Sequence, residues 1–125
     1  MNTEFEPVIG LEIHVQLGSK TKLFCSCPNG VGDDTKPNTA ICPVCAGHPG
    51  VLPVLTEGAL ELAVRAGLSM NCKTNETSSF SRKHYFYPDL PKGYQITQNE
   101  EPINGAGYIE ITFGPKENLQ KKRIG

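Results

Sequence analysis

The residues from Val8 to Leu17 alternate strictly between apolar and polar side chains. Side chains of a β-strand point to opposite faces with a period of two, so this stretch predicts a strand with one face in a core. The other face carries Glu12 and His14, two residues apart on one element, an arrangement that suits a metal site or proton transfer. A solvated strand face without function is the alternative that the pattern leaves open. The predicted core face consists of Ile9, Leu11, Ile13, Val15 and Leu17.

Two closely spaced cysteine pairs follow this stretch. Cys25-x-Cys27 is separated by fourteen residues from Cys42-x-x-Cys45. Four thiolates in two pairs can close a tetrahedral zinc site, and a metal would hold an intervening loop rich in Gly, Asn and Pro that packing cannot hold. Two disulfides, four unligated thiols, or a site in which His48 replaces one cysteine are the alternatives. The sequence therefore predicts a structural zinc site, with four sulfurs as the preferred ligands.

The composition limits where such a chain works. The 125 residues suffice for one domain with a modest core, and the net charge of -1 argues against a generally basic nucleic-acid coat but not against a local basic patch. The start lacks the pattern of a signal peptide, and no apolar run approaches a membrane span. We therefore expect a reducing cytoplasm, where clustered cysteines indicate metal more often than disulfides. The fifth cysteine, Cys72, is expected to be a small buried side chain that is dispensable for metal binding.

A segment over 78–98, which contains two prolines, concentrates aromatic and cationic side chains. The prolines exclude a continuous helix. Cations of this kind contact phosphates, and aromatic rings stack on bases, so the segment fits a nucleotide or an RNA end. A structured loop with core aromatics and solvated cations is an equally good reading of the residues alone. The cations are Arg82, Lys83 and Lys92, and the rings that could stack are Tyr85, Tyr87 and Tyr94.

The remaining elements are brief. A helix is predicted over about 57–68, with Thr56 as its N-cap and Gly67 near its C-terminus. Short strands are predicted over 22–28, where the strand runs into a loop, and over 94–98 and 107–113, and 121–125 reads as the opening of another strand. Ending on such an element predicts that the chain is a fragment. The predicted buried stripe of the helix is Ala59, Leu62, Ala63 and Ala66.

Three segments together closely resemble one family, the B subunit of aspartyl/glutamyl-tRNA amidotransferase. They are Val-Ile-Gly-Leu-Glu-Ile-His-Val-Gln-Leu from residue 8, the two cysteine pairs with Pro-Asn-Thr-x-x-Cys-Pro-Val-Cys-x-Gly-x-Pro-Gly, and Arg-Lys-x-Tyr-Phe-Tyr-Pro-Asp-Leu-Pro-Lys-Gly-Tyr-Gln from residue 82. They cover almost the whole chain in the family's order. An archaeal-type relative of the same family is the main competing assignment.

The resemblance implies a fold and a domain. The family's catalytic domain is α+β, with a curved, mainly antiparallel sheet likened to glutamine synthetase. Residues 1–125 would be the incomplete amino-terminal part of this catalytic (cradle) domain, with one main helix. A four-cysteine zinc knuckle would be inserted at about 22–50, in a structural role.

The resemblance also implies an activity. The family is a glutamine-hydrolysing carbon–nitrogen ligase that corrects Glu-tRNA(Gln) and, in many organisms, Asp-tRNA(Asn). ATP phosphorylates the side-chain carboxylate, and ammonia from a partner amidase displaces the phosphate. Glu12 and His14 match the family's magnesium and catalytic motif. Arg82, Lys83 and Lys92 match its loop near ATP and the tRNA end. The implied partners are the amidase, a small third subunit and the misacylated tRNA.

Two departures from the family stand out. His84 occupies a position where the family commonly has Asn. The family's chains are also several times longer, with further acidic residues of the metal site on a later strand and with domains that grip tRNA. We therefore expect these 125 residues alone to be inactive. The competing interpretation is a non-catalytic zinc-knuckle module that binds RNA or protein, or simply a truncated fragment.

Overall fold

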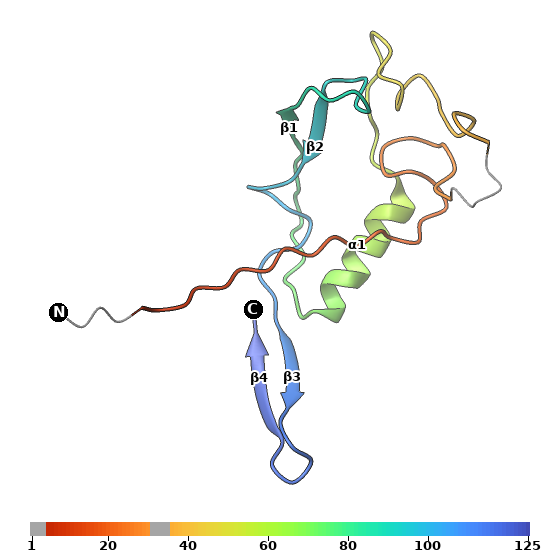
Figure 1. Cartoon of the computed structure of the whole chain (residues 1–125). Coiled ribbons are helices and arrows are strands. Elements are labelled where there is room, and N and C mark those ends of the chain that lie inside the picture. The colour runs from red at the N-terminus through yellow and green to blue at the C-terminus, as the bar shows by residue number, and fades with distance from the viewer. Residues whose placement is uncertain (1–4, 31–35) are drawn as a thin grey trace.

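The computed structural model describes residues 5–30 and 36–125. In this part of the chain the regular elements are one helix and four short strands (Figure 1). Residues 1–4 of the predicted domain and 31–35 of the predicted knuckle insertion lie outside the described residues. The elements are α1 (Glu57–Ser69), β1 (Ser81–His84), β2 (Tyr94–Thr97), β3 (Ile109–Phe113) and β4 (Gln120–Ile124).

The strands form two separate antiparallel hairpins. β1 pairs with β2, with Arg82 opposite Ile96, and β3 pairs with β4, with Ile111 opposite Lys122. The α+β class is therefore confirmed, but the described residues contain two two-stranded ladders where one curved sheet was expected. The predicted strands at 94–98, 107–113 and 121–125 correspond to β2, β3 and β4. The strand predicted over 22–28 is wrong, because the pairing there is limited to an isolated bridge between Thr21 and Pro28 at the two ends of that segment.

The start of α1 is tied to the first cysteine segment. Thr56 occupies the N-cap position, as predicted, but its side chain makes no capping hydrogen bond. Its hydroxyl instead donates to the Lys22 carbonyl at 3.3 Å, and its backbone N–H donates to the Leu23 carbonyl at 2.9 Å. The helix thereby begins next to the segment that leads into Cys25, and hydrogen bonds to backbone carbonyls hold the two elements together.

The far half of α1 packs against the segment that follows β2. Gly67 is buried, and a Cβ at this position would overlap the side chain of Asn104. That side chain donates to the Ala63 carbonyl at 2.8 Å. The helix ends at Ser69, one residue beyond the predicted bound, and Gly67 lies near its C-terminus as predicted, where it also serves close packing. Of the predicted stripe, Ala59 is buried and the others are half-buried.

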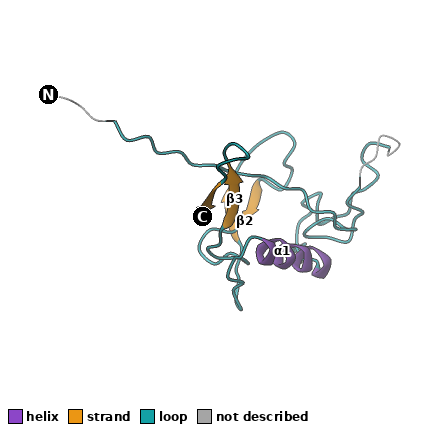
Figure 2. Ribbon diagram, turned by 90° about the horizontal axis from the view of Figure 1, so that it is seen from below, coloured by secondary structure: helices purple, strands orange, loops and turns teal. Residues whose placement is uncertain are grey.

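The segment that was predicted to be the central strand forms no ladder. Residues 8–17 form an extended chain that passes α1 at its carboxyl end and projects to one side of the molecule at its amino end (Figures 1 and 2). Ile13 is 78% exposed and Val15 is 71% exposed, so the apolar face is not in a core. The alternation is present, but the backbone groups of this stretch find no neighbouring strand among the described residues, and a strand is stable only with one. The prediction of a buried strand here is therefore wrong for this structure.

Burial is low throughout. The accessible surface is 10952 Å², whereas a compact monomer of this mass would expose about 6,600 Å². Among the described residues the buried apolar side chains are limited to Cys25, Cys27 and Ala59. The helix and strands therefore leave most side chains on the surface and enclose little core.

No helix among the described residues is long and apolar enough to cross a membrane.

Candidate functional site

The first cysteine pair sits on a tight hairpin-like loop. The Lys22 N–H donates to the Cys27 carbonyl at 2.8 Å, and the Asn29 N–H donates to the Lys20 carbonyl at 3.0 Å. The Asn29 side chain closes the base of this loop by donating to the Leu17 and Ser19 carbonyls, each at 3.3 Å. The loop therefore holds Cys25 and Cys27 at its tip without a regular strand, and both side chains are buried.

The second pair lies on a turn that curls around its own sulfur. The Cys42 N–H donates to the Cys45 sulfur at 3.2 Å, and the Ala46 N–H donates to the Cys42 carbonyl at 3.0 Å. Gly47 then adopts a positive φ of 72°, a conformation that glycine takes at little cost. The His48 N–H donates back to the Pro43 carbonyl at 3.0 Å. The spacing of the motif and Gly47 together aim both sulfurs to one side.

The structure brings the four predicted ligands together. The sulfurs of Cys25, Cys27, Cys42 and Cys45 all lie within 4.8 Å of one another. A tetrahedral zinc ion with Zn–S bonds of about 2.3 Å separates its sulfurs by about 3.8 Å, so a small contraction would seat the ion. The donor set of four thiols fits zinc, and no histidine is needed to complete it. We refer to residues 22–27 and 42–48 as the cysteine knuckle.

The thiols of the knuckle are electrostatically unequal. Burial, followed by a hydrogen bond with Cys42, raises the pKa of Cys27 to about 12. A backbone hydrogen bond at Cys45 lowers the pKa of Cys42 to about 7. Metal ligation requires thiolates, so loading the site must release the Cys27 proton. The same low-dielectric setting that raises this pKa would strengthen the bond between a thiolate and a divalent cation.

Lys22 joins the two halves of the knuckle, a role that the sequence pattern did not predict. Its ammonium donates to the Ala40 carbonyl at 2.6 Å and lies 3.8 Å from the Cys45 sulfur. Four thiolates around one zinc ion carry a net charge of about -2, which a nearby cation stabilises. The spacing of the cysteines does not reveal this contact, because the two partners lie on different sides of the 28–41 loop.

Glu12 and His14 lie together, as their spacing predicts, but apart from the other site residues. The His14 Nε2 and a Glu12 carboxylate oxygen are 3.3 Å apart, and the two side chains are 89% and 87% exposed. Among the described residues, no hydrogen bond or ion pair joins either of them to Arg82, Lys83 or Lys92. A pair of donors on an open segment can hold a metal only with further ligands.

The basic aromatic segment is built from two consecutive turns. The Leu90 N–H donates to the Tyr87 carbonyl at 2.9 Å, and the Gly93 N–H donates to the Leu90 carbonyl at 3.0 Å. Pro88 and Pro91 occupy the second position of each turn, where the fixed φ of proline is favourable. The bond from the Tyr85 N–H to the Gly93 carbonyl, at 3.0 Å, closes the loop onto the hairpin of β1 and β2.

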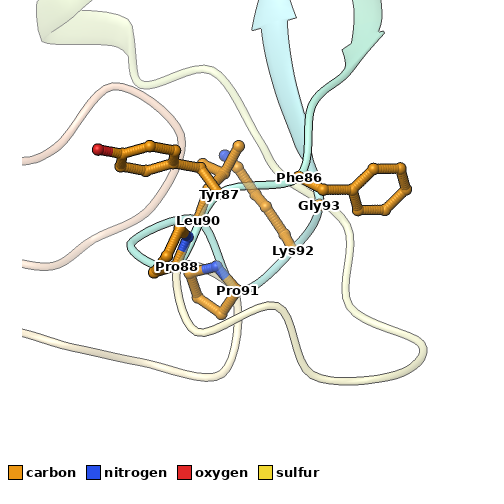
Figure 3. Close-up of a pocket in the computed structure, with 7 residues that line it drawn as sticks. All are labelled: Phe86, Tyr87, Pro88, Leu90, Pro91, Lys92 and Gly93. Atoms are coloured by element: carbon orange, nitrogen blue, oxygen red, sulfur yellow. The ribbon is translucent and has the colours of Figure 1, made fainter.

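The side chains of this loop point to different sides. Phe86 extends away on one side, while Tyr87 and the amine of Lys92 lie toward the other (Figure 3). The loop lines an open hollow of about 550 Å³. The Tyr87 ring stacks on Tyr85, with centroids 5.8 Å apart and planes 10° from parallel. These rings are half-exposed, so they are available for contact with a ligand.

Two of the three predicted cations share one ring. The Arg82 guanidinium lies 5.6 Å from the centroid of Tyr94, and the Lys92 ammonium lies 5.3 Å from the same centroid. Lys83 makes no such contact. The sequence identified all three cations by charge alone, and it could not sort them, because β1 was not predicted as a strand.

Comparison with known proteins assigns the family. The family model described as "GatB/GatE catalytic domain" matches residues 7–125. The B subunit of the aspartyl/glutamyl-tRNA(Asn/Gln) amidotransferase of Elusimicrobium minutum is 62% identical over 87% of this chain, and that of Persephonella marina is 58% identical over 97%. The corresponding protein of Thermobifida fusca is 50% identical over 97%. The chain covers 23% to 25% of these relatives, so it spans about a quarter of their length. The resemblance found in the sequence is thus confirmed, and the chain belongs to the GatB/GatE catalytic-domain family.

Proposed function

We infer that this chain is the amino-terminal part of the catalytic domain of the B subunit in a glutamine-hydrolysing, tRNA-dependent amidotransferase. The observation that carries the proposal is the family match over residues 7–125, which includes the Glu12–His14 pair, the cysteine knuckle and the basic loop. The relatives that match over most of this chain carry that enzyme's name. A single motif would support far less, because each of the three has a structural explanation on its own.

The proposed reaction has two steps. The γ-phosphoryl group of ATP passes to the side-chain carboxylate of glutamate or aspartate on the tRNA, and ADP leaves. Ammonia then attacks the acyl carbonyl, the bond to the phosphate oxygen breaks, and loss of a proton gives the amide and inorganic phosphate. Both steps need positive charge around the phosphoryl oxygens, because negative charge moves onto them and onto the leaving group.

Residues of this chain are proposed for each of these tasks. Glu12 supplies a carboxylate oxygen of the kind that magnesium prefers, while His14 is a less usual magnesium ligand and suits manganese or the orientation of a water. The metal ion, when bound, neutralises phosphate charge. Arg82, Lys83 and Lys92 would hold phosphates of ATP or of the tRNA end. The zinc of the cysteine knuckle would be structural.

The proposed setting follows from the same assignment. The chain would work in a cytoplasmic heterotrimer with an amidase, which supplies ammonia, and a small third subunit. The misacylated tRNA would be gripped largely by parts of the B subunit that lie outside these residues. The single apolar face of residues 8–17 supports this setting, because it offers a surface on which other parts of the enzyme can pack.

The test is the Glu12→Gln variant of the complete enzyme, assayed for ADP and for amidated tRNA. We expect loss of both by orders of magnitude, corresponding to several kcal/mol for one metal ligand. The fold and the glutaminase partner should be unaffected, because the Glu12 side chain is 87% exposed. Gln16→Ala, four residues along on the same face, is the matched control and should retain activity. Near-normal turnover by Glu12→Gln would exclude Glu12 as a ligand.

A non-catalytic knuckle module is the second candidate. One observation favours it: the four cysteines are already assembled, whereas Glu12 and His14 are exposed and, among the described residues, form an ion pair only with each other. The turns that build the 85–93 loop argue against it, because a pure knuckle module does not need an ordered basic loop. Amidation that depends on Glu12 in the complete enzyme would reject this candidate.

A further inference from the structure

A cavity lies at the seam between the cysteine knuckle and the hairpin of β1 and β2. Its volume is about 180 Å³. One wall comes from Gly47 and His48 of the knuckle, and the opposite wall comes from Arg82, Lys92 and Tyr94. Apolar side chains over 51–53 complete the lining. The cavity therefore combines two cations, a phenol ring and an imidazole from segments that lie far apart in the sequence.

The register of the hairpin decides which cations can reach this cavity. Arg82 is paired with Ile96, and His84 is paired with Tyr94, so these four residues share one face. Lys83 is paired with Gln95 and belongs to the other face. Arg82 and Tyr94 line the cavity and Lys83 does not. The two adjacent cations of β1 therefore cannot serve the same ligand.

The charge of the cavity is not neutralised within the protein. Among the described residues, neither Arg82 nor Lys92 forms an ion pair with an acidic side chain. Both cations lie over Tyr94, at 5.6 Å and 5.3 Å from its centroid, and this ring limits their freedom without cancelling their charge. The imidazole of His48 can donate a further hydrogen bond in either protonation state. Such a set of donors is suited to a phosphate group.

The size of the cavity narrows the ligand further. Pockets that enclose whole drug-sized ligands measure about 300–1,000 Å³, so 180 Å³ suits one phosphate group better than a complete nucleotide. A neighbouring cavity of about 320 Å³ shares Arg82 and Tyr94 with it and is bordered by Phe80 and Ile96. A phosphate in the first cavity could therefore carry its organic part in the second, which is more apolar.

The knuckle also fixes the position of Lys92. Gly47 packs against the Lys92 backbone so closely that a Cβ on Gly47 would lie 2.9 Å from the Lys92 Cα. Gly47 is itself held by its N–H bond to the Val44 carbonyl at 3.1 Å, between Cys42 and Cys45 of the metal-binding turn. A change in the shape of the knuckle must therefore move the Lys92 backbone. The metal-binding turn therefore packs against the basic loop at Lys92 and holds it in place.

We propose that this cavity binds a phosphate group, free or carried by a nucleotide, through Arg82, Lys92 and His48, and that metal binding by the cysteine knuckle sets its affinity. The proposal deepens the proposed function and rests on it for the identity of the nucleotide as ATP. It gives the knuckle a part in substrate binding. It also separates Arg82 and Lys92 from Lys83, which remains available to a second ligand on the opposite face.

The binding test uses the zinc-loaded 125-residue chain in about 0.15 M salt, which screens exposed charges beyond about 8 Å. Inorganic phosphate, pyrophosphate, ATP and adenosine are titrated by calorimetry and by NMR of the wild-type chain. We expect shifts at Arg82, His48 and Lys92 with each phosphate ligand, and none with adenosine alone. Competition between phosphate and ATP would identify the nucleotide as a source, and phosphate binding without competition would limit the cavity to the free anion. Shifts spread equally over Lys83 and Lys122 would overturn the proposal.

Matched variants test the assignment of residues. Arg82→Gln and Lys92→Gln should each weaken phosphate binding roughly tenfold to hundredfold, the range for a hydrogen bond to a charged group. Lys122→Gln removes the same charge from the other hairpin and should leave the affinity within about twofold. Equal losses in all three variants would reduce the effect to general charge and reject the pocket.

Two further changes test the link to the metal. Gly47→Ala keeps all four sulfurs, and elemental analysis selects preparations that hold one zinc per chain. In these, the added Cβ should displace Lys92 and weaken phosphate binding. Removal of zinc by a chelator should weaken binding in the wild-type chain and cause little further loss in Gly47→Ala. Unchanged phosphate affinity in both experiments would reject the coupling. None of these measurements requires amidation, so phosphate binding can prove absent while the proposed function holds. Conversely, Glu12→Gln can retain amidation, which would reject the proposed role of Glu12, while the cavity still binds phosphate.

Discussion

The cysteine knuckle and residues 8–17 both lack a large core to pack against, but the knuckle is ordered by local contacts and residues 8–17 are left exposed. The knuckle is held by hydrogen bonds among residues a few positions apart, and its four sulfurs lie within 4.8 Å of one another. Residues 8–17 have the stronger periodic pattern, yet they make no ladder and expose their apolar face. Hydrogen bonds between residues close in the sequence are therefore sufficient to assemble the cysteine site. An alternating strand needs more: a neighbouring strand for its backbone hydrogen bonds and a second surface that buries its apolar face.

The largest expected effect concerns catalysis by the chain alone. The four cysteines of the knuckle are assembled, whereas the residues proposed to hold magnesium, Glu12 and His14, are exposed. The 125 residues supplied with ATP, Mg²⁺, ammonia and Glu-tRNA(Gln) should therefore produce no amidated tRNA. Glu12 and His14 alone cannot offset the reluctance of magnesium to shed water. The measurement follows ADP and Gln-tRNA beside the complete enzyme. Substrate-dependent turnover comparable to that enzyme would show that the active site has been misplaced.

The second effect concerns the metal of the knuckle. We expect one zinc per chain, and Cys45→Ser should weaken zinc binding by about a hundredfold or more, because residues that only orient metal ligands already change affinity by about 10- to 100-fold. Elemental analysis and competition with a chromophoric chelator measure this. Cys72→Ala is the control and should retain the metal, since Cys72 lies outside the cluster. Less than about a tenth of an equivalent in the wild type, with melting unaffected by chelator, would refute a structural zinc site.

The third prediction tests the unpaired segment directly. In the isolated chain, Ile13→Asp should change the free energy of unfolding by less than about 0.5 kcal/mol, as exposed substitutions do. In the complete protein, if residues 8–17 are covered, it should cost at least about 2 kcal/mol, because an unpaired polar group is then buried. Gln16→Asp adds the same charge to the polar face and should be tolerated in both. Equal effects of Ile13→Asp in the two proteins would show that this face is not covered.

The smallest effect is expected in the hairpin of β3 and β4, which closes locally without a metal. Lys121 donates to Glu110 at 2.9 Å, which lowers the pKa of Glu110 and raises that of Lys121. Because the pKa of Glu110 is lower in the folded than in the unfolded protein, its carboxylate stabilises the fold at pH values above the unfolded-state pKa, and this stabilisation is lost as the pH falls through the folded-state pKa. Because the pKa of Lys121 is raised by folding, its stabilisation is lost as the pH rises through the folded-state pKa. The pair therefore acts between these limits.

Glu110→Gln should make the unfolding of this hairpin less sensitive to acid and should change its stability near neutral pH only slightly, because both side chains are exposed. Amide exchange in β3 and β4 as a function of pH is the measurement. An acid sensitivity identical to that of the wild type would mean that the pair contributes nothing.

The agreement between sequence and structure follows the distance over which each feature is determined. The spacing of Cys42 and Cys45 predicted their convergence, because a short turn fixes it. The charge of Arg82 was enough to propose that it binds phosphate. Charge alone could not predict that Arg82 and Lys83 lie on opposite faces of the hairpin. That separation depends on the pairing of β1 with β2, and the Ser-Arg-Lys-His sequence of β1 has no apolar alternation that would indicate a strand.

Longer-range features were beyond the pattern. The place of Gly67 near the end of α1 could be predicted, but only the approach of Asn104, from the segment that follows β2, explains why a side chain is not tolerated there. The contact of Lys22 with Ala40 and Cys45 likewise arises across a loop. The strand predicted over 8–17 failed for the converse reason, since a periodic pattern states which face should be covered and does not supply the cover.

The exposed apolar row of residues 8–17 has a consequence for the life of the chain in the cell. At about 5–20 residues per second, the roughly 108 residues that follow this row in the sequence take about 5–22 s to be made. Throughout that interval the side chains of Ile9, Leu11 and Ile13 have no cover from the residues described. Such a row is the kind of signal that chaperones and proteases read on unfinished proteins. A chain whose apolar face stays uncovered for long is therefore more open to recognition by chaperones and proteases.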